Sequence, residues 1–269
     1  MADQLRKVRS DLPVILLAVV LLICSVVALA PAEQPRAPQS SPWHGKGVWI
    51  WYLSDSPEVL AAKLKKANMD TVFIKSADGD RVWRQFNKAL VSALQDSGIH
   101  VCGWQYVYGK HPLREARAAA SVKAAGADCF VIDAEKEYKH RHRQAAIYTK
   151  ELRRLLGPSF EFGFYSFPYL RLHKSMPYRT FLGPGAATAN LPQMYWKEIG
   201  VSPERILKDT YLDNLALGRP VYPIGQSWRS PPAKEIARFS KRVKKLGGQG
   251  LSWWSLDHSS KATWKELSR

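Results

Sequence analysis

Residues 129–135 read CFVIDAE, an apolar run that ends in two acids separated by one alanine. Such a run is typical of a buried strand in a parallel sheet. Successive side chains of a strand point to opposite faces, so Val131, Asp133 and Glu135 share one face. We therefore expect both acids on the same side, at the C-terminal end of a strand whose other face packs on helices.

Similar apolar runs alternate with amphipathic stretches along the rest of the chain, which is the pattern of parallel strands covered by helices. The expected strands are 47–53, 71–76, 100–106, 129–135, 161–166, 191–195, 221–226 and 250–256. The expected helices are 57–67, 84–96, 112–125, 141–156, 169–180, 203–217, 232–246 and 260–267. Eight strand–helix units predict an α/β fold, a closed (β/α)8 TIM barrel, for which about 250 residues is an ordinary size.

Glycine and proline mark many of the expected helix boundaries. Glycine is expected in a left-handed conformation just after a helix, and proline in the first turn of one. The residues in these places are Gly98, Gly126, Gly157, Gly218 and Gly247 at helix ends, and Pro57, Pro112, Pro203 and Pro232 at helix starts.

The N-terminal segment has the composition of an export signal. Arg6, Lys7 and Arg9 precede an uncharged apolar stretch at 12–30. Positive residues before such a stretch direct the following chain to the outer side of a membrane. We expect 1–32 to be a signal peptide or a transmembrane anchor helix, 33–46 a Pro/Ser-rich tether, and 47–269 the barrel, secreted or membrane-anchored on the extracytoplasmic side.

The chain is strongly basic. Lysine and arginine total 40 against 23 aspartate and glutamate, which gives a formal net charge of +17. A field of this sign attracts polyanions, among them nucleic acid, anionic membranes and anionic cell-wall polymers. Because the sequence has no zinc-finger spacing, aromatic RNA-binding signature or helix-turn-helix, we expect no specific nucleic-acid partner. We also expect the protein to be a monomer.

The three cysteines allow one pair in the barrel. Cys24 lies in the N-terminal apolar stretch, whereas Cys102 and Cys129 fall on neighbouring expected strands. A disulfide between these two is geometrically possible, but buried cysteines are common as free thiols, and two free thiols are what we expect.

Aromatic, amide and charged side chains gather at the C-terminal ends of the expected strands, where a barrel of this kind builds its active site. Aromatic rings stack on the apolar faces of sugars while amides and carboxylates bind sugar hydroxyl groups, so this composition indicates a glycan site. The residues expected to bind substrate are Trp51, Lys75, Asp78, Gln105, Tyr165, Gln193, Tyr195, Gln226, Trp228, Trp254 and Asp257.

Asp133 and Glu135 are the expected catalytic pair. Two carboxyl groups close together in a partly desolvated site raise the pKa of one of them, which keeps an acid protonated near neutral pH so that it can donate to a leaving oxygen. Glu135, nearer the mouth, is expected to be that donor, and Asp133 to orient it and to stabilise charge. The alternative is a structural role, in which the acids only bind barrel neighbours such as Lys75.

Five short motifs follow one another at the expected strand ends. They are Thr71–Gly79 (TVFIKSADG), Asp133-Ala134-Glu135, Tyr165-Ser166, Gln193-Met194-Tyr195 and Trp253-Trp254-Ser255. With these motifs, over most of residues 47–258, the chain resembles glycoside hydrolase family 25, the lysozyme-like muramidases. The resemblance implies Glu135 as the acid and Asp133 as its partner.

The chain departs from the family pattern in the first strand, which has no acid before Asp55, and at Asp78, where the family has glutamate. An Asp-x-Glu at the end of the fourth strand is also similar to family 18 chitinases, which implies a possible substrate-assisted route.

These features together predict a glycoside hydrolase that acts on an N-acetylhexosamine-containing polysaccharide, with cell-wall peptidoglycan as the first candidate. No metal or organic cofactor is implied, because the sequence lacks a Gly-rich phosphate loop, a His-Glu-x-x-His element and a serine nucleophile elbow. The alternative is a non-catalytic, membrane-tethered glycan-binding barrel with a degenerate site. A Glu135 open to a cleft near Tyr165 or Tyr195 would favour catalysis, and a Glu135 locked by Lys75 under Trp254 would favour binding alone.

Overall fold

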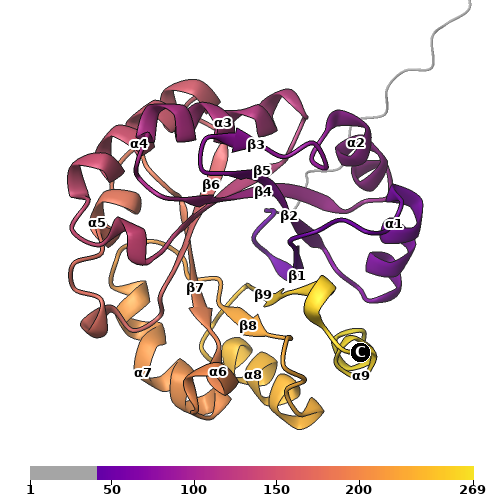
Figure 1. Ribbon diagram of the computed structural model, residues 1–269. Coiled ribbons are helices and arrows are strands. Elements are labelled where there is room, and N and C mark those ends of the chain that lie inside the picture. The colour runs from indigo at the N-terminus through magenta and orange to yellow at the C-terminus, as the bar shows by residue number, and fades with distance from the viewer. Residues whose placement is uncertain (1–40) are drawn as a thin grey trace, which may run out of the picture. The chain divides into compact units, whose positions relative to one another are not determined.

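The computed structural model describes residues 41–269, so the expectations for the signal or anchor at 1–32 and for most of the tether lie outside the described residues. Eight parallel strands form a closed ring, in which β1 pairs with both β2 and β9. Figure 1 shows the helices around the outside of these strands, so the predicted (β/α)8 barrel is confirmed. The strands are β1 (Gly45–Ile50), β2 (Thr71–Asp78), β4 (His100–Val107), β5 (Cys129–Ala134), β6 (Glu161–Ser166), β7 (Ala189–Met194), β8 (Ile224–Gln226) and β9 (Gly250–Trp254).

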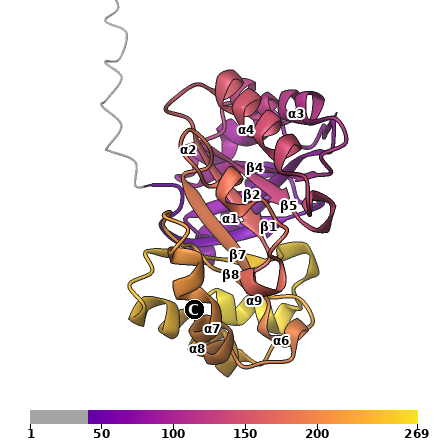
Figure 2. The same cartoon turned by 90° about the vertical axis from the view of Figure 1, so that its left-hand side faces the viewer.

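The helices begin and end near the expected boundaries. The side chains of Ser56 and Ser202 accept a backbone N–H in the first turn of the helix that follows each of them, as N-terminal caps do. Gly157 and Gly247, which follow two of the helices, have the predicted positive φ. Figure 2 shows α3 and α4 packed side by side. The helices are α1 (Pro57–Lys66), α2 (Lys88–Asp96), α3 (Pro112–Ala124), α4 (His142–Leu156), α5 (Tyr178–Phe181), α6 (Trp196–Ile199), α7 (Pro203–Leu215), α8 (Ala233–Lys245) and α9 (Lys261–Leu267).

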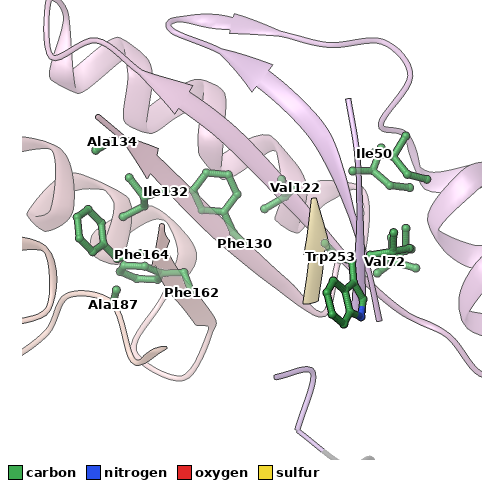
Figure 3. Packing of buried hydrophobic residues seen from close by; sticks show 14 of the residues in the cluster. Ile50, Val72, Val122, Phe130, Ile132, Ala134, Phe162, Phe164, Ala187 and Trp253 are labelled. Atoms are coloured by element: carbon green, nitrogen blue, oxygen red, sulfur yellow. The ribbon is translucent and has the colours of Figure 1, made fainter. Parts of the chain in front are cut away.

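Apolar side chains form an outer and an inner core. The outer core lies between the strands and the helices, and Figure 3 shows Phe130, Ile132 and Phe164 within it. The inner core lies inside the barrel and includes Val131, together with Trp49, Phe73, Leu191 and Ile224. Since Phe130 and Val131 belong to different cores, the face assignment that the sequence predicts for β5 is confirmed.

The segment expected to form a helix at 84–96 is shorter than predicted. Asn87 caps α2, with its side chain accepting the N–H of Leu90, so the helix starts at Lys88. Before it, Arg81–Val82 forms β3, a short strand that pairs antiparallel with the end of β2. This hairpin adds a rim to the C-terminal end of the barrel.

The helix expected at 169–180 is wrong. The structure has a 3-10 turn at Leu170–Leu172 and the four-residue α5 in its place. Pro177 explains the interruption, because proline has no N–H to donate and disfavours helical geometry in the residue before it. One short helix that was not expected, α6, follows β7 directly.

A disulfide joins Cys102 and Cys129, so the expectation of two free thiols is wrong. The two residues are direct neighbours in the parallel pairing of β4 and β5, with 4.5 Å between their Cα atoms. Both side chains are buried inside the barrel. The sequence predicted adjacent strands but not their register, and the register is what brings the sulfur atoms together.

Trp43 closes the N-terminal end of the barrel. Its Nε1 donates a hydrogen bond to the carboxylate of Glu161 at 3.2 Å, and its ring stacks on Phe73. The side chain is buried, and β1 begins at Gly45 rather than at the expected Gly47. The end of the stretch that the sequence assigned to a tether therefore belongs to the folded barrel.

Candidate active site

The paired acids lie at the C-terminal end of β5, as expected. Asp133 is paired in register with Tyr106 on β4 and Tyr165 on β6, which places it at one level of the barrel interior with those two residues. It is 3% exposed, and its Oδ1 accepts no hydrogen bond from the described residues. Burial raises the pKa of Asp133 well above its ordinary value, and the neighbouring Glu135 raises it further.

Glu135 is the outer member of the pair. It follows the last residue of β5 and is partly exposed, and its Oε1 accepts a hydrogen bond from Nε2 of Gln193 on β7 at 2.7 Å. Burial raises the pKa of Glu135, while the bond from Gln193 opposes that rise. Glu137 adds to the rise as a neighbouring like charge. Glu135 is therefore an acid that reaches the mouth of the barrel in a fixed orientation.

Lys75 forms no salt bridge with either acid, although its charge opposes part of the rise in the pKa of Asp133. Its ammonium group binds Asp78 at 2.5 Å and is 1% exposed. The same group lies 4.3 Å from the ring centroid of Trp51, 4.6 Å from that of Trp83 and 4.9 Å from that of Trp104. Three aromatic faces and one carboxylate thus hold the cation, and the salt bridge between Lys75 and Glu135 that would indicate a locked site is not present.

Tyrosine hydroxyl groups line the same part of the barrel. The hydroxyls of Tyr165 and Tyr195 are 2.7 Å apart, and burial raises the pKa of both. Tyr106 donates a hydrogen bond to Glu137 at 2.5 Å. Since Asp133 and Glu135 also raise the pKa of Tyr165 and Tyr195, the acids and these hydroxyls form one electrostatically connected group.

Indole rings form the floor beneath this group. The Trp254 ring centroid lies 5.2 Å from that of Trp104, 5.9 Å from that of Trp51 and 5.9 Å from that of Tyr165. Trp49 packs beneath them and donates a hydrogen bond to Ser252 at 2.8 Å. An apolar floor beside carboxyl and hydroxyl groups is what a sugar ring requires, with one apolar face and a hydroxylated edge.

The structure also shows residues of this group that the sequence reasoning missed. Glu137 was not assigned to the site, yet it lies close enough to both acids to raise their pKa. Tyr106 and Trp83 were not assigned to the site. Asp133, Glu135 and Glu137 follow one another at every second position, and this spacing is the signal that could have included Glu137.

Three of the expected substrate-binding residues have structural roles instead. Gln105 is fully buried, donates to the carbonyls of Gly79 and Glu115, and accepts from Tyr148, because it lies on the helix-facing side of β4. Gln226 accepts from the backbone of α6 and donates to the carbonyl of Trp228. Asp257 accepts the backbone N–H groups of residues 51 and 52, and so fixes the chain after β1.

Trp228 occupies the loop after β8, at the C-terminal end of the barrel. It is partly buried, and the guanidinium of Arg229 lies 4.8 Å from its ring centroid. The structure therefore assembles eight of the expected substrate-binding residues at or near the mouth. They are Trp51, Lys75, Asp78, Tyr165, Gln193, Tyr195, Trp228 and Trp254.

Residues 41–269 have no cluster of three or more His, Cys, Asp or Glu side chains that could hold a metal ion. The helices of this part of the chain include none that is both long and apolar enough to cross a membrane.

Comparisons with known proteins give the fold. None of the protein-family models matches the sequence, and no curated protein matches it. Among solved structures, the spore cortex-lytic enzyme SleL of Bacillus cereus is similar with a TM-score of 0.65 and 9% identity, over 83% of this chain and 73% of that one. The active domain 2 of a thermostable chitinase from Pyrococcus furiosus has a TM-score of 0.60 and 13% identity, over 86% and 95%.

A third similar structure is a family 128 endo-β-1,3-glucanase from Amycolatopsis mediterranei, with a TM-score of 0.55 and 13% identity over 84% of this chain and 98% of that one. At these identities the similarity establishes a shared barrel fold, one that glycosidases use. The resemblance to family 25 in particular stays a prediction.

Proposed function

We propose that this chain is a glycoside hydrolase that cleaves an N-acetylhexosamine-containing polysaccharide, with peptidoglycan as the first candidate substrate. One observation carries the proposal. Asp133 and Glu135 lie side by side at the barrel mouth, and within residues 41–269 neither forms a salt bridge, because Lys75 binds Asp78. A barrel that used these acids for structure alone would be expected to neutralise them.

The pair is suited to proton transfer. Because of burial and mutual repulsion, the two carboxyl groups share one proton, and they keep it up to a higher pH than an isolated carboxyl group keeps its own. Glu135 is the partly exposed member, so it delivers the proton to the glycosidic oxygen as the bond from that oxygen to the anomeric carbon breaks. Asp133, which is charged whenever Glu135 carries the shared proton, stabilises the positive charge that develops on the sugar.

The tyrosine pair fits an N-acetylated sugar. Of the two protons carried by the hydroxyls of Tyr165 and Tyr195, one is used in the hydrogen bond between them, and the other can be donated to a ligand. An acetamido group held here could attack the anomeric carbon through its carbonyl oxygen while Glu135 protonates the leaving oxygen. Water would then add to the same carbon, which breaks its bond to the acetamido oxygen, and would return a proton to Glu135.

Export to an extracytoplasmic location belongs to the same proposal. The basic residues and apolar stretch within 1–32 predict it, and the buried disulfide between Cys102 and Cys129 supports it, because disulfides persist in oxidising compartments. A location outside the cytoplasm would give the barrel access to cell-envelope polymers.

The test is cleavage by the full-length chain. Purified protein is incubated with peptidoglycan and with chitin oligomers, and mass spectrometry identifies the released fragments. Glu135→Gln keeps the size of the side chain and removes the transferable proton, so it should lower the rate by about 10²- to 10⁴-fold with an unchanged fold. Glu137→Gln makes the same chemical change two residues away, and because the Glu137 charge raises the pKa of both acids, this variant should retain cleavage with an altered pH dependence.

Two results would contradict the proposal. If the wild-type protein binds these glycans without cleaving any, the chain is the non-catalytic glycan-binding barrel. If Glu137→Gln abolishes cleavage and Glu135→Gln does not, the acid has been assigned to the wrong residue.

A further inference from the structure

A hollow of about 230 Å³ lies at the C-terminal ends of β2 and β4 and shares Asp78 with the candidate active site. Asp78 belongs to both places. One of its oxygens binds Lys75 in the candidate active site, and the other accepts a hydrogen bond at 2.9 Å from the hydroxyl of Tyr108, which lines the hollow. A ligand that extends from the acids over this rim would therefore enter the hollow without leaving the protein surface.

The acids that line the hollow all have partners. Asp78 is held by Lys75 and Tyr108, and Asp80 forms an ion pair with Arg114 at 2.8 Å. The carboxylate of Glu115, which is 2% exposed, accepts the backbone N–H groups of residues 108 to 111 at 3.0 to 3.2 Å. Each negative charge is thus compensated by a group of the protein itself.

The cations that line the hollow are different. Arg81 and Lys110 are exposed, and neither forms an ion pair with any residue in the described part of the chain. Lys110 lies 5.9 Å from the ring centroid of Tyr108, so an aromatic face and a cation are close to each other. The rim hairpin formed by β2 and β3 carries Arg81 opposite Asp78. Besides the partnered acids, the hollow presents the two cations Arg81 and Lys110, the ring of Tyr108 and the imidazole of His111.

We propose that this hollow is a subsite for an acidic sugar unit, in which the ring lies against Tyr108 and a carboxylate is bound by Arg81 and Lys110. The inference rests on the proposed function for its glycan, and it adds the charge of the unit bound next to the cleaved one. Uncompensated cations in a concave site attract an anion more strongly than the same charges spread on a convex surface do. The neighbouring Tyr108 ring gives a sugar an apolar face to contact.

Binding of two oligosaccharides of equal length tests the subsite. The full-length Glu135→Gln protein, which should not cleave, is titrated with a hyaluronan hexamer, which alternates N-acetylglucosamine with glucuronate, and with neutral chitohexaose. Calorimetry at low salt measures the affinities. The double change Arg81→Ala with Lys110→Ala should weaken hyaluronan binding about three- to ten-fold, since each rim charge contributes modestly. Chitohexaose binding should change less than two-fold.

The control removes the same amount of charge from the other end of the barrel. Lys65 and Lys66 are exposed in the last turn of α1, which runs antiparallel to the strands, and Lys65→Ala with Lys66→Ala should leave both affinities unchanged. Equal losses in the test and control proteins would overturn the subsite in favour of a general field effect. Equal losses for both oligosaccharides would also overturn it, as would a failure of the starting protein to bind hyaluronan.

These outcomes are distinct from a failure of the proposed function. A wild-type protein that cleaves chitin oligomers but binds hyaluronan no more tightly than chitohexaose refutes the subsite and leaves the hydrolase intact. A wild-type protein that cleaves nothing but loses hyaluronan affinity specifically in the Arg81 and Lys110 variant refutes the hydrolase and leaves the acidic-sugar site intact.

Discussion

Replacing the cysteines inside the barrel should destabilise the protein by a predictable amount. The disulfide joins residues 27 positions apart. In the chain-entropy description, closing a loop of that length lowers the entropy of the unfolded chain by about 12 cal/mol/K, which corresponds to about 3.5 kcal/mol of folding free energy at 25 °C. Cys102→Ala and Cys129→Ala should each lose that amount, with a further contribution from the space left by the sulfur atom.

The double variant gives the sharper expectation. Because either single change already breaks the bond, the losses should not add, and the double variant should be only slightly less stable than either single variant. Urea unfolding followed by tryptophan fluorescence measures all four proteins. When the disulfide of the wild-type protein is reduced in the unfolded state, the free energy of unfolding of the reduced protein should be close to that of the variants. Since both cysteines are fully buried, a reductant added to the folded barrel should act only as fast as the barrel opens.

Additive losses of less than about 1 kcal/mol for each single change would refute this reasoning, because they would show two independently packed side chains rather than one cross-link. An unchanged midpoint after reduction, with free thiols confirmed by mass, would do the same.

Three further predictions concern charge and the start of the barrel. Burial raises the pKa of Asp133 above its ordinary value near 4, so the folded state binds that proton more tightly and wild-type stability should fall as pH rises above about 4. Asp133→Asn removes this dependence, and a difference in Tm between the two proteins that stays constant with pH would contradict it. Binding to isolated cell wall should weaken between low and physiological salt, because at 0.15 M the field of the +17 charge is screened over about 8 Å. Binding that does not depend on salt would exclude attraction by this field. A chain that starts at Ser41 should have the Tm of the whole protein. A chain that starts at Lys46 loses the buried Trp43, and its free energy of unfolding should be lower by roughly 3 kcal/mol or more. Equal stability of the two truncated chains would show that Trp43 does not close the barrel.

The alternation of apolar runs with amphipathic stretches was sufficient to predict the barrel. Strand order in such a fold follows chain order, so eight runs in sequence specify the whole ring once closure is assumed. The helix expected at 169–180 does not form, because Pro177 interrupts it. Propensity and periodicity are local properties, and a single proline can override both.

The direction of the candidate site's side chains was predicted correctly where strand alternation alone decides which of them face inward. Asp133 and Glu135 follow that rule, and so do Lys75 and Tyr165. Gln105 failed because it was assigned by its place near a strand end, although it lies one position from Trp104 and so points toward the helices. Which acid binds Lys75 depends on rotamers and neighbouring strands, and no pattern within one strand contains that information.

The position of Trp43 has a consequence for how the protein can be attached to something else. The chain enters the barrel beside Trp43, at the ends of the strands where β6 and β9 begin, and the acids lie where β5 finishes. A link made through the preceding residues therefore holds the domain by its closed end and leaves the mouth free to meet a long polymer. The same geometry favours capture through an N-terminal tag for surface-based binding measurements, because the captured barrel would present its acids to the solution.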